Sequence, residues 1–330
     1  MRLSDFDYAL PPERVAQTPI EPRDAARLLV LDRASAALLH RHVRDLPDVL
    51  RPGDLLVANR SRVLPARVLG HLRGGGKAEL LLLRRLAPGR WEALGRPARR
   101  LRRGDTVSVG NLDVTVIAAL SGGVREIEVA SDAALLAAGS TPLPPYIHGW
   151  QGDPERYQTI FSAEPGSAAA PTAGLHFTAE LLQRLADRGI DFATLVLHVG
   201  LDTFRPVTEA DPRKHVIHRE WYSMPGELQQ RVERTRARGG RVIAVGTTSV
   251  RALETWSATQ APEGWTDLFI LPGHRFTLVD AMLTNFHLPQ SSLLMLVSAF
   301  AGRERVLAAY AEAIRLEYRF YSFGDAMLLL

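Results

Sequence analysis

The stretch Arg241-Val242-Ile243-Ala244-Val245-Gly246-Thr247-Thr248-Ser249-Val250-Arg251 decides the fold class of this 330-residue chain. Its continuous apolar run predicts a strand buried on both faces, which is typical of a parallel sheet covered by helices. The hydroxyl-rich turn that follows predicts a helix N-terminus, with the helix over residues 249–257. A buried strand that leads into a helix is the repeating unit of α/β domains.

The same alternation of strands and helices extends on both sides of this stretch. Apolar residues with a helical period predict helices over residues 178–188, 225–238 and 304–317. Short apolar runs predict strands over residues 53–59, 192–199 and 279–286. We therefore expect a mainly parallel sheet covered by helices.

A different pattern interrupts this alternation after residue 60. Short strands follow one another at spacings of about ten residues, with Gly and Pro turns between them, which predicts a small barrel or sandwich. The proline-rich stretch 142–147 is a predicted linker. Because a strand of the α/β type precedes this segment, we interpret the segment as an insertion. Residues 1–59 and 151–330 then form the α/β domain, and residues 60–150 form the inserted β-barrel domain.

The charge of the chain is unevenly distributed. The net charge is +4, yet the segment from Arg60 to Asp105 holds thirteen basic residues against three carboxylates. This asymmetry predicts a polyanionic partner, most simply nucleic acid. The alternative is a solvated arginine-rich surface without contacts. The arginines that we expect to hold RNA are Arg96, Arg99, Arg100, Arg102 and Arg103.

Several classes of protein and site are excluded by composition and motifs. The chain has no cysteine, which excludes disulfides, thiolate zinc sites and cysteine nucleophiles. The longest apolar run, 293–301, is shorter than the ~18 residues of a membrane span, and we expect a soluble cytoplasmic protein without a membrane partner. No dinucleotide-binding fingerprint, P-loop, G-x-S-x-G or H-E-x-x-H motif occurs. His215 and His218 lack a third ligand in register, so we expect no metal site.

Polar clusters follow four of the predicted strands. They are Asn59-Arg60-Ser61-Arg62, His198-Val199-Gly200, Gly246-Thr247-Thr248-Ser249-Val250-Arg251 and Thr284-Asn285-Phe286-His287. One such cluster alone is an ordinary capped turn. Because ligands of α/β proteins bind at the carboxyl ends of strands, four clusters predict a shared site.

Three histidines and one carboxylate are candidates for proton transfer. His176, His198 and His287 stand near strand ends or in a glycine-containing loop. The alternative for each is a semi-buried histidine whose hydrogen bonds are satisfied. Asp280 lies in the predicted strand 279–286, where it is either functional or a capping acid.

Long motifs that occur in a fixed order add to this interpretation. They are Gly53-Asp54-Leu55-Leu56-Val57-Ala58-Asn59, Arg62-Val63-Leu64-Pro65-Ala66-Arg67, Pro171-Thr172-Ala173-Gly174-Leu175-His176-Phe177, Leu197-His198-Val199-Gly200, Val245-Gly246-Thr247-Thr248-Ser249-Val250-Arg251, Thr284-Asn285-Phe286-His287-Leu288-Pro289 and Tyr321-Ser322-Phe323-Gly324-Asp325. With these motifs the chain resembles the S-adenosylmethionine:tRNA ribosyltransferase-isomerase family of queuosine biosynthesis, from Asp5 to Asp325. Two positions depart from the family pattern. Asp202 stands where the family usually has glycine, and Arg60 where it has a small polar residue.

The resemblance implies a fold, a reaction and partners. The fold is a barrel-like α/β main domain with parallel strands and an inserted all-β barrel. The reaction transfers and isomerises the ribosyl part of S-adenosylmethionine onto 7-aminomethyl-7-deazaguanine at the wobble position of tRNA, which gives epoxyqueuosine, adenine and methionine. S-adenosylmethionine is consumed as a substrate, so no cofactor is expected. The partners are S-adenosylmethionine and tRNA that carries the precursor base, and we expect a monomer.

This chemistry needs a base and substrate contacts. The sulfonium acidifies ribose C5′, and adenine must be protonated or hydrogen-bonded before it leaves. We expect catalytic roles for His176, His198, Asp280 and His287, and the sequence leaves open which of them is the base. We expect substrate contacts from Asn59, Arg62, Arg67, Thr172, Gly174, Gly246, Thr247, Thr248, Arg251, Asn285, Ser322 and Asp325.

Two other classes of function stay open at this point. A pure RNA-binding module explains the basic segment but gives the strand-end clusters no role. A sugar-processing α/β-barrel hydrolase uses the strand ends but normally needs two suitably spaced carboxylates, which are scarce here.

Overall fold

The chain forms two compact units in a computed structural model that describes residues 1–200 and 207–330. The main unit comprises residues 1–61, 145–164 and 170–330, and the β unit comprises residues 62–144 and 165–169. These boundaries differ from the expected ones at 60 and 150, because segment 145–164 packs with the main unit. For example, Gln17 Nε2 of the main unit donates to the carbonyl oxygen of Tyr146 in this segment over 2.9 Å.

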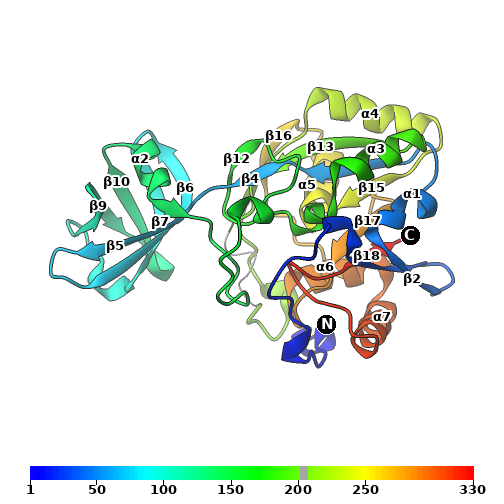
Figure 1. Cartoon of the computed structure of the whole chain (residues 1–330), viewed down its shortest axis with the longest axis horizontal. Helices are drawn as coiled ribbons and strands as arrows, with labels where there is room; N and C mark the ends of the chain where they lie inside the picture. Colours follow the sequence, from blue (N-terminus) through cyan, green and yellow to red (C-terminus); the bar gives the residue numbers. More distant parts are fainter. Residues whose placement is uncertain (201–206) are drawn as a thin grey trace. The chain divides into compact units, whose positions relative to one another are not determined.

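A nine-stranded mixed sheet forms the centre of the main unit (Figure 1). Its order is β16-β14-β13-β3-β15-β17-β18-β1-β2, so among the described residues the sheet has two ends. The strands are β1 (Arg27–Leu31), β2 (Leu38–His42), β3 (Leu55–Asn59), β13 (Asp191–Leu197), β14 (Glu220–Ser223), β15 (Val242–Val245), β16 (Glu263–Thr266), β17 (Ala281–Asn285) and β18 (Ala326–Leu329). The four neighbours β13, β3, β15 and β17 are parallel, which places their carboxyl ends at one edge.

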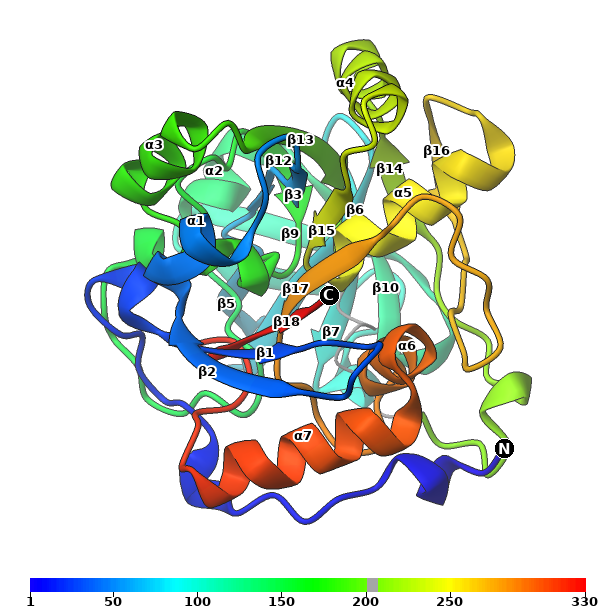
Figure 2. The same ribbon diagram turned by 90° about the vertical axis from the view of Figure 1, so that its right-hand side faces the viewer.

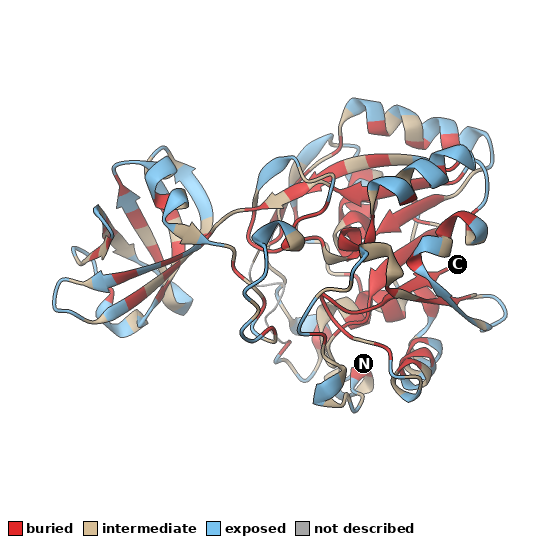
Figure 3. Cartoon of the chain, in the orientation of Figure 1, coloured by how far each residue is buried: buried red, intermediate tan, exposed pale blue. Residues whose placement is uncertain are grey.

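Helices cover the main sheet, and Figure 2 shows α7 beneath β1 and β2. The α-helices are α1 (Leu46–Val49), α3 (Ala179–Asp187), α4 (Gly226–Ala237), α5 (Thr247–Thr259), α6 (Ser292–Ala301) and α7 (Arg303–Arg315). In Figure 3 the central strands are buried, whereas α3 and α4 expose their outer faces. The Thr178 hydroxyl caps α3 by accepting from Leu181 N over 3.1 Å, and Leu181 and Leu185 are buried. No helix in residues 1–200 and 207–330 is long and apolar enough to cross a membrane.

The β unit is a closed antiparallel barrel of six strands. Its strands are β5 (Arg67–Leu72), β6 (Lys77–Ala87), β7 (Arg90–Arg96), β8 (Thr106–Val109), β9 (Leu112–Ala119) and β10 (Val124–Val129), with β11 (Gly139–Ser140) and helix α2 (Asp132–Ala137) appended. Pairing of β5 with β8 closes the barrel. Gly70 permits this closure, because a Cβ there would lie 2.6 Å from the Ser108 carbonyl oxygen. A further pair, β4 (Ser61–Val63) with β12 (Glu164–Ser167), lies where the chain passes between the units.

The fold class expected from the sequence is confirmed. The main unit is α/β with adjacent parallel strands, and the β unit is a small all-β barrel. The expected helices 178–188, 225–238 and 304–317 correspond to α3, α4 and α7. Helix α6 was not expected, because its residues are buried on most sides and show no polar stripe.

Candidate active site

The four polar clusters lie at one edge of the main sheet, as expected from strand direction. Asn59 ends β3, His198 follows β13, Gly246 follows β15 and Asn285 ends β17. Parallel neighbours are about 4.8 Å apart, so these residues form a continuous polar edge. We call this group the strand-end cluster.

Asn285 is the hydrogen-bond centre of the cluster and joins β17 to the short helix η8 (Thr172–His176). Its Oδ1 accepts from the Thr172 hydroxyl over 3.0 Å. Its Nδ2 lies 3.1 Å from His176 Nε2 and 3.2 Å from the Tyr321 carbonyl oxygen. With Oδ1 accepting, Nδ2 is the donor, and His176 Nε2 must accept from it.

His176 is therefore a neutral imidazole with its proton on Nδ1. Burial lowers the pKa of His176 to about 4, with a further lowering contribution from Arg319. At neutral pH this side chain carries no charge, and its one N–H donates to the Arg23 backbone.

Two glycines meet local backbone requirements, one in η8 and one before α5. A Cβ on Gly174 would lie 2.8 Å from Thr159 Cγ2. Gly246 has a φ of +88°, a backbone conformation that favours glycine. It lies beside Ala173 of η8, and a Cβ at position 246 would be 3.5 Å from the Ala173 Cβ. Thr247 is buried and begins α5, followed by the half-buried Thr248. The turn thus points a helix N-terminus, with its positive dipole end, at the strand-end cluster.

Asn59 holds the strand ends in place. Its Oδ1 accepts from Leu197 N over 3.1 Å and from Ser61 N over 3.0 Å. Its Nδ2 donates to the Leu197 carbonyl over 2.8 Å and lies 3.4 Å from Thr248 Oγ1. Because both ends of the carboxamide are occupied, Asn59 positions β13 and α5 rather than presenting a free polar group.

His198 has the free ring nitrogen of the cluster. Its backbone N–H donates to the Trp221 carbonyl over 2.9 Å, and the two rings stack with centroids 5.3 Å apart. Nδ1 is buried and has no hydrogen-bond partner within the described part of the chain. Burial lowers the pKa of His198, although nearby Glu164 opposes the shift. A neutral imidazole with an unpaired nitrogen is suited to accept a proton.

His287 lies on the opposite face of β17 from Asn285. Its Nε2 is 2.9 Å from Thr284 Oγ1, and Thr284 alternates with Asn285 along the strand. Its backbone N–H donates to the Tyr310 hydroxyl over 3.0 Å. Burial lowers the pKa of His287 to about 3, so this histidine is also neutral. It supports the end of β17 from beneath the strand-end cluster.

Asp280 lies at the wrong end of the sheet for a role in the cluster, and this expectation is corrected. Strand β17 begins at Ala281, directly after Asp280, and ends at Asn285. Five extended residues span about 16 Å. Asp280 Oδ2 accepts from Val242 N over 2.8 Å, and Oδ1 pairs with Arg236 over 3.0 Å. Asp280 therefore fixes the amino ends of β15 and β17.

Arg251 forms a buried ion pair that ties α5 to β14. It donates to Glu220 through Nη1 and to the Leu268 carbonyl through Nε over 3.0 Å. Glu220 also accepts from Gly200 N over 2.9 Å and lies 3.1 Å from His218 Nε2. Burial alone would raise the pKa of Glu220, but Arg251 and His218 lower it below its ordinary value. Arg251 Nη2 is buried and has no partner in residues 1–200 and 207–330.

Ser322 and Asp325 both lie in the main unit. The Ser322 hydroxyl is 2.7 Å from the Tyr146 hydroxyl. Asp325 accepts from Arg27 N over 2.8 Å and from Arg319 N over 2.7 Å, and so secures β18 beside the end of β17.

The remaining expected site residues lie elsewhere in the chain or outside the described residues. Arg67 belongs to the β unit and pairs with Glu79 over 2.9 Å. Arg62 is half-buried in β4. Arg60, one of the two departures, pairs with Glu164 over 3.3 Å. Asp202, the other departure, lies outside the described residues.

The five expected RNA-binding arginines form an exposed loop in the β unit, which we call the arginine loop. None of them has an ion pair within the described residues, whereas four other arginines of the β unit do. These paired arginines are Arg67, Arg84, Arg85 and Arg90, each with a carboxylate. The members of the loop are Arg96, Arg99, Arg100, Arg102 and Arg103.

A buried arginine supports the arginine loop from below. Arg125 is 7% exposed and donates to the carbonyl oxygens of Ala98 and Leu101. A buried cation that donates to backbone carbonyls fixes the path of the loop. The loop thus presents unpaired positive charge on a fixed backbone.

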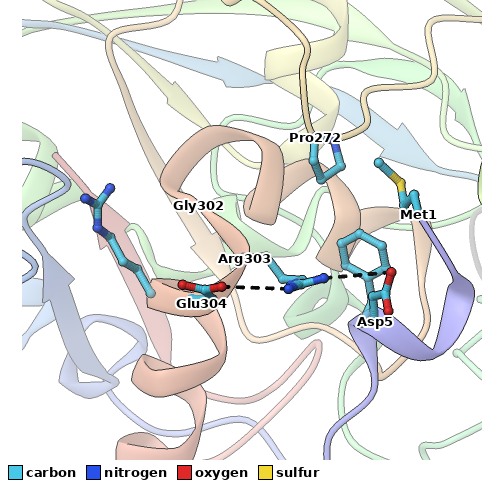
Figure 4. Close-up of a pocket in the computed structure, with 8 residues that line it drawn as sticks. Met1, Asp5, Pro272, Gly302, Arg303 and Glu304 are labelled. Carbon is cyan, nitrogen blue, oxygen red and sulfur yellow. Dashed lines mark ion pairs between the residues drawn. The ribbon is translucent and has the colours of Figure 1, made fainter.

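A separate pocket lies near the start of α7 (Figure 4) and contains none of the expected site residues. Within it, Arg303 lies 3.8 Å from Asp5 and 3.8 Å from Glu304, and these are surface ion pairs. The lining residues are Met1, Asp5, Phe6, Pro272, Gly302, Arg303, Glu304 and Arg305. The strand-end cluster is the better candidate active site, because it holds the perturbed histidines.

Three contributors were not expected from the sequence. Tyr321 contacts Asn285 through its backbone carbonyl, which no residue type signals. Trp221 stacks on His198, and Glu220 anchors Arg251. The segment Glu220-Trp221-Tyr222 does carry a signal, since an acid directly before two aromatic residues in a short strand implies a buried charge with a partner. His215 and His218 are not on a helix, and the described residues contain no group of three or more His, Cys, Asp or Glu that could hold a metal ion.

Comparison with known proteins identifies the family. A family model described as queuosine biosynthesis protein matches residues 3–329. A protein of Symbiobacterium thermophilum named S-adenosylmethionine:tRNA ribosyltransferase-isomerase is 54% identical over 341 residues, covering 100% of both chains. A protein of Thermotoga maritima with the same name is 48% identical over 336 residues, again covering 100% of both. The crystal structure of S-adenosylmethionine tRNA ribosyltransferase from that organism covers 99% of this chain and 100% of its own, with a TM-score of 0.59 and 40% identity.

Proposed function

The chain belongs to the queuosine biosynthesis protein family and is a transferase-isomerase, and on this premise we propose its reaction and the roles of its residues. The enzyme transfers and isomerises the ribosyl part of S-adenosylmethionine onto the aminomethyl group of 7-aminomethyl-7-deazaguanine at the wobble position of tRNA. The products are epoxyqueuosine in tRNA, adenine and methionine. The observation that carries the proposal is the strand-end cluster, in which neutral histidines and a helix N-terminus lie at one edge of the sheet.

His198 acts as the base. The positive sulfonium makes the C5′ protons acidic, and a neutral imidazole with a free nitrogen is suited to remove one of them. Of the three histidines in the proposal, His176 and His287 have their Nε2 atoms in hydrogen bonds, whereas His198 Nδ1 is unpaired within the described residues. Its lowered pKa keeps it unprotonated at neutral pH.

His176 donates a hydrogen bond to the departing adenine. Asn285 holds the Nε2 atom of His176 and keeps the proton on Nδ1, where the Arg23 backbone accepts it until adenine takes the place of that acceptor. The resulting electron density on adenine is stabilised by a fixed donor in a buried site, where hydrogen bonds are stronger than in water.

The N-terminus of α5 binds the methionine carboxylate. Gly246, Thr247 and Thr248 begin this helix without a side-chain cap. Backbone N–H groups at such a terminus, together with the helix dipole, favour an anion. The neighbouring threonine hydroxyls add donors at the same place.

The arginine loop binds the tRNA backbone. Phosphate contacts supply most of the sequence-independent affinity for RNA, and unpaired arginines make them without first breaking an ion pair. The target base lies in an unpaired loop, so it enters the cluster without the opening of a duplex.

A single incubation tests this function. The protein is mixed with S-adenosylmethionine and either tRNA that carries the precursor base or the same tRNA with guanine at that position. Adenine release that requires the precursor supports the proposal. Adenine release without it supports a hydrolase, and tRNA binding without any adenine release contradicts the proposed reaction.

A further inference from the structure

A row of aromatic side chains leads away from the strand-end cluster across three neighbouring strands. His198 follows β13 and stands opposite Trp221 of β14, whose carbonyl accepts its N–H over 2.9 Å. Trp221 in turn is the register partner of Trp265 in β16, the edge strand of the sheet (Figure 2). Directly opposed residues on paired strands project from the same face, so the three rings line one side of the sheet. We call them the aromatic row.

The row lies on the face of these strands that is turned away from α5. Its neighbours Glu220 and Tyr222 alternate with Trp221 and are both buried. Glu220 pairs with Arg251 of α5, and the Tyr222 hydroxyl lies 3.2 Å from Thr259 Oγ1 at the end of the same helix. Helix α5 therefore covers the opposite face.

Exposure increases outward along the row, which begins at the half-buried His198 and Trp221. Trp265 at the sheet edge is 44% exposed. Among the described residues, Trp265 is the one aromatic side chain in the group of exposed large hydrophobic residues, and it adjoins two further rings rather than standing alone. Contiguous exposed apolar groups of this kind mark binding surfaces.

Charge beside the row points to the partner. Arg219 is exposed, and its guanidinium carbon lies 6.0 Å from the centre of the Trp265 ring. Ser223 and Glu263 also lie on this face, at the next register pair along β14 and β16. Aromatic faces next to an arginine form the surface on which proteins stack unpaired bases while they hold a phosphate.

We propose that Trp265 and Trp221 stack unpaired bases of the RNA loop that flank the modified nucleotide. The inference rests on the proposed function only for the identity of the RNA. Two strand spacings separate β13 from β16, so the row extends for about 10 Å. Stacked nucleotides are about 3.4 Å apart along a strand, so a row of this length fits a short run of nucleotides rather than one adenine. The row starts at His198, so an RNA loop on it leads its target base into the strand-end cluster.

The test compares binding of a stem–loop RNA with binding of a fully paired duplex of equal length. Trp265→Ala is the main variant, and Trp265→Phe keeps an aromatic face at the same position. Leu39→Ala is the matched control, because Leu39 is a similarly exposed apolar residue, 51% exposed, on β2 at the other end of the sheet. Arg219→Gln tests the adjacent phosphate contact.

We expect Trp265→Ala to weaken stem–loop binding by about 5- to 150-fold, the range for the loss of one base stack. Duplex binding and the KM for S-adenosylmethionine should not change. Trp265→Phe should retain most of the affinity, and Leu39→Ala should behave like the parent chain. Arg219→Gln should reduce the salt slope of stem–loop binding by about 0.7, the value for one phosphate on a single strand.

Three outcomes overturn the proposal. Stem–loop affinity that is unchanged in Trp265→Ala shows that no base stacks there. If Trp265→Ala weakens stem–loop and duplex binding equally, the substitution affects RNA binding in general rather than base stacking. If it raises the KM for S-adenosylmethionine and leaves stem–loop affinity normal, Trp265 contacts the adenine of S-adenosylmethionine instead. Because the binding assay needs no precursor base, it is independent of catalysis. Loop binding that depends on Trp265 without adenine release would refute the proposed reaction and leave this inference standing.

Discussion

Asn285 Nδ2 lies 3.1 Å from His176 Nε2, and this hydrogen bond fixes which nitrogen of the histidine carries the proton. The Tyr321 carbonyl oxygen can only accept and lies 3.2 Å from the same Nδ2, so the carboxamide cannot turn over without losing this hydrogen bond. A residue at the end of β17 thus sets the protonation state of a residue in η8. The site is prepared by this pairing before any substrate binds.

Asn285→Asp should therefore impair the chemical step more than substrate binding. A carboxylate at this position cannot donate to His176 Nε2 and favours a protonated imidazole instead. We expect kcat to fall by at least ~10²-fold, the usual scale for removal of an acid–base function, with a smaller change in KM for S-adenosylmethionine. Steady-state kinetics with saturating tRNA measure both constants. A normal kcat in a folded variant would show that the tautomer of His176 does not matter.

His198→Ala should lower kcat by at least ~10²-fold if this histidine is the base. In the parent enzyme, activity should fall as the pH drops through the pKa of His198, which burial moves below the ordinary histidine value of 6.5. The variant should lose this acidic limb of the pH profile of kcat/KM.

Asp280→Asn is the matched control for His198→Ala, since Asp280 is a polar residue on the same sheet but at its amino edge. It should keep kcat within about threefold and lose at most ~1 kcal/mol of stability, because its ion pair with Arg236 is partly exposed. A large loss of kcat in Asp280→Asn would return this carboxylate to the mechanism.

His287 should make the protein less stable in mild acid. Its pKa is about 3 in the folded state and about 6.5 when unfolded, so between these values the unfolded chain binds more protons. The free energy of unfolding should then fall by up to about 1.4 kcal/mol for each pH unit below 6.5. Urea unfolding at several pH values measures this slope, which His287→Gln should reduce. An unchanged slope in the variant would mean that His287 is protonated in the folded protein.

The arginine loop should account for much of the salt dependence of tRNA binding. Replacing four of its five arginines with Gln should weaken binding and flatten the plot of log K against log salt, by about 0.7 to 0.9 for each phosphate that the protein no longer neutralises. S-adenosylmethionine binding should not change, because its proposed contacts lie in the main unit. The replaced residues are Arg99, Arg100, Arg102 and Arg103.

A control variant removes the same amount of charge from arginines that are already paired. The residues are Arg67, Arg84, Arg85 and Arg90, whose carboxylate partners lie within ion-pair distance. This variant should alter the salt slope much less. Equal slopes for the two quadruple variants would show that net charge, rather than the arginine loop, attracts the tRNA.

The strand-end cluster was largely predictable because parallel strands bring their carboxyl ends together. Once residues 53–59, 192–199, 241–245 and 279–286 are taken as parallel strands, the polar residues after them must share an edge. The structure confirms this for Asn59, His198, Gly246 and Asn285.

The sequence-based predictions differ from the structure where chain direction or tertiary packing decides the position of a residue or the presence of a helix. The sequence pattern groups Asp280 with Asn285 because both lie in one predicted strand, yet a residue before a strand and a residue at its end are on opposite edges. Helix α6 has no polar face for periodicity to detect, because the surrounding elements bury it. The pairing of Trp221 with Trp265 depends on strand register between segments far apart in the sequence, which local patterns do not specify.

The most direct test of the whole account is adenine release measured with S-adenosylmethionine and tRNA that carries 7-aminomethyl-7-deazaguanine. We expect adenine and methionine in equal amounts, each equal to the amount of modified tRNA formed, and no release with tRNA that carries guanine at that position. His198→Ala should release adenine at least ~10²-fold more slowly under the same conditions. Adenine release that does not require the precursor base, or none from the folded parent protein, would contradict the proposed function.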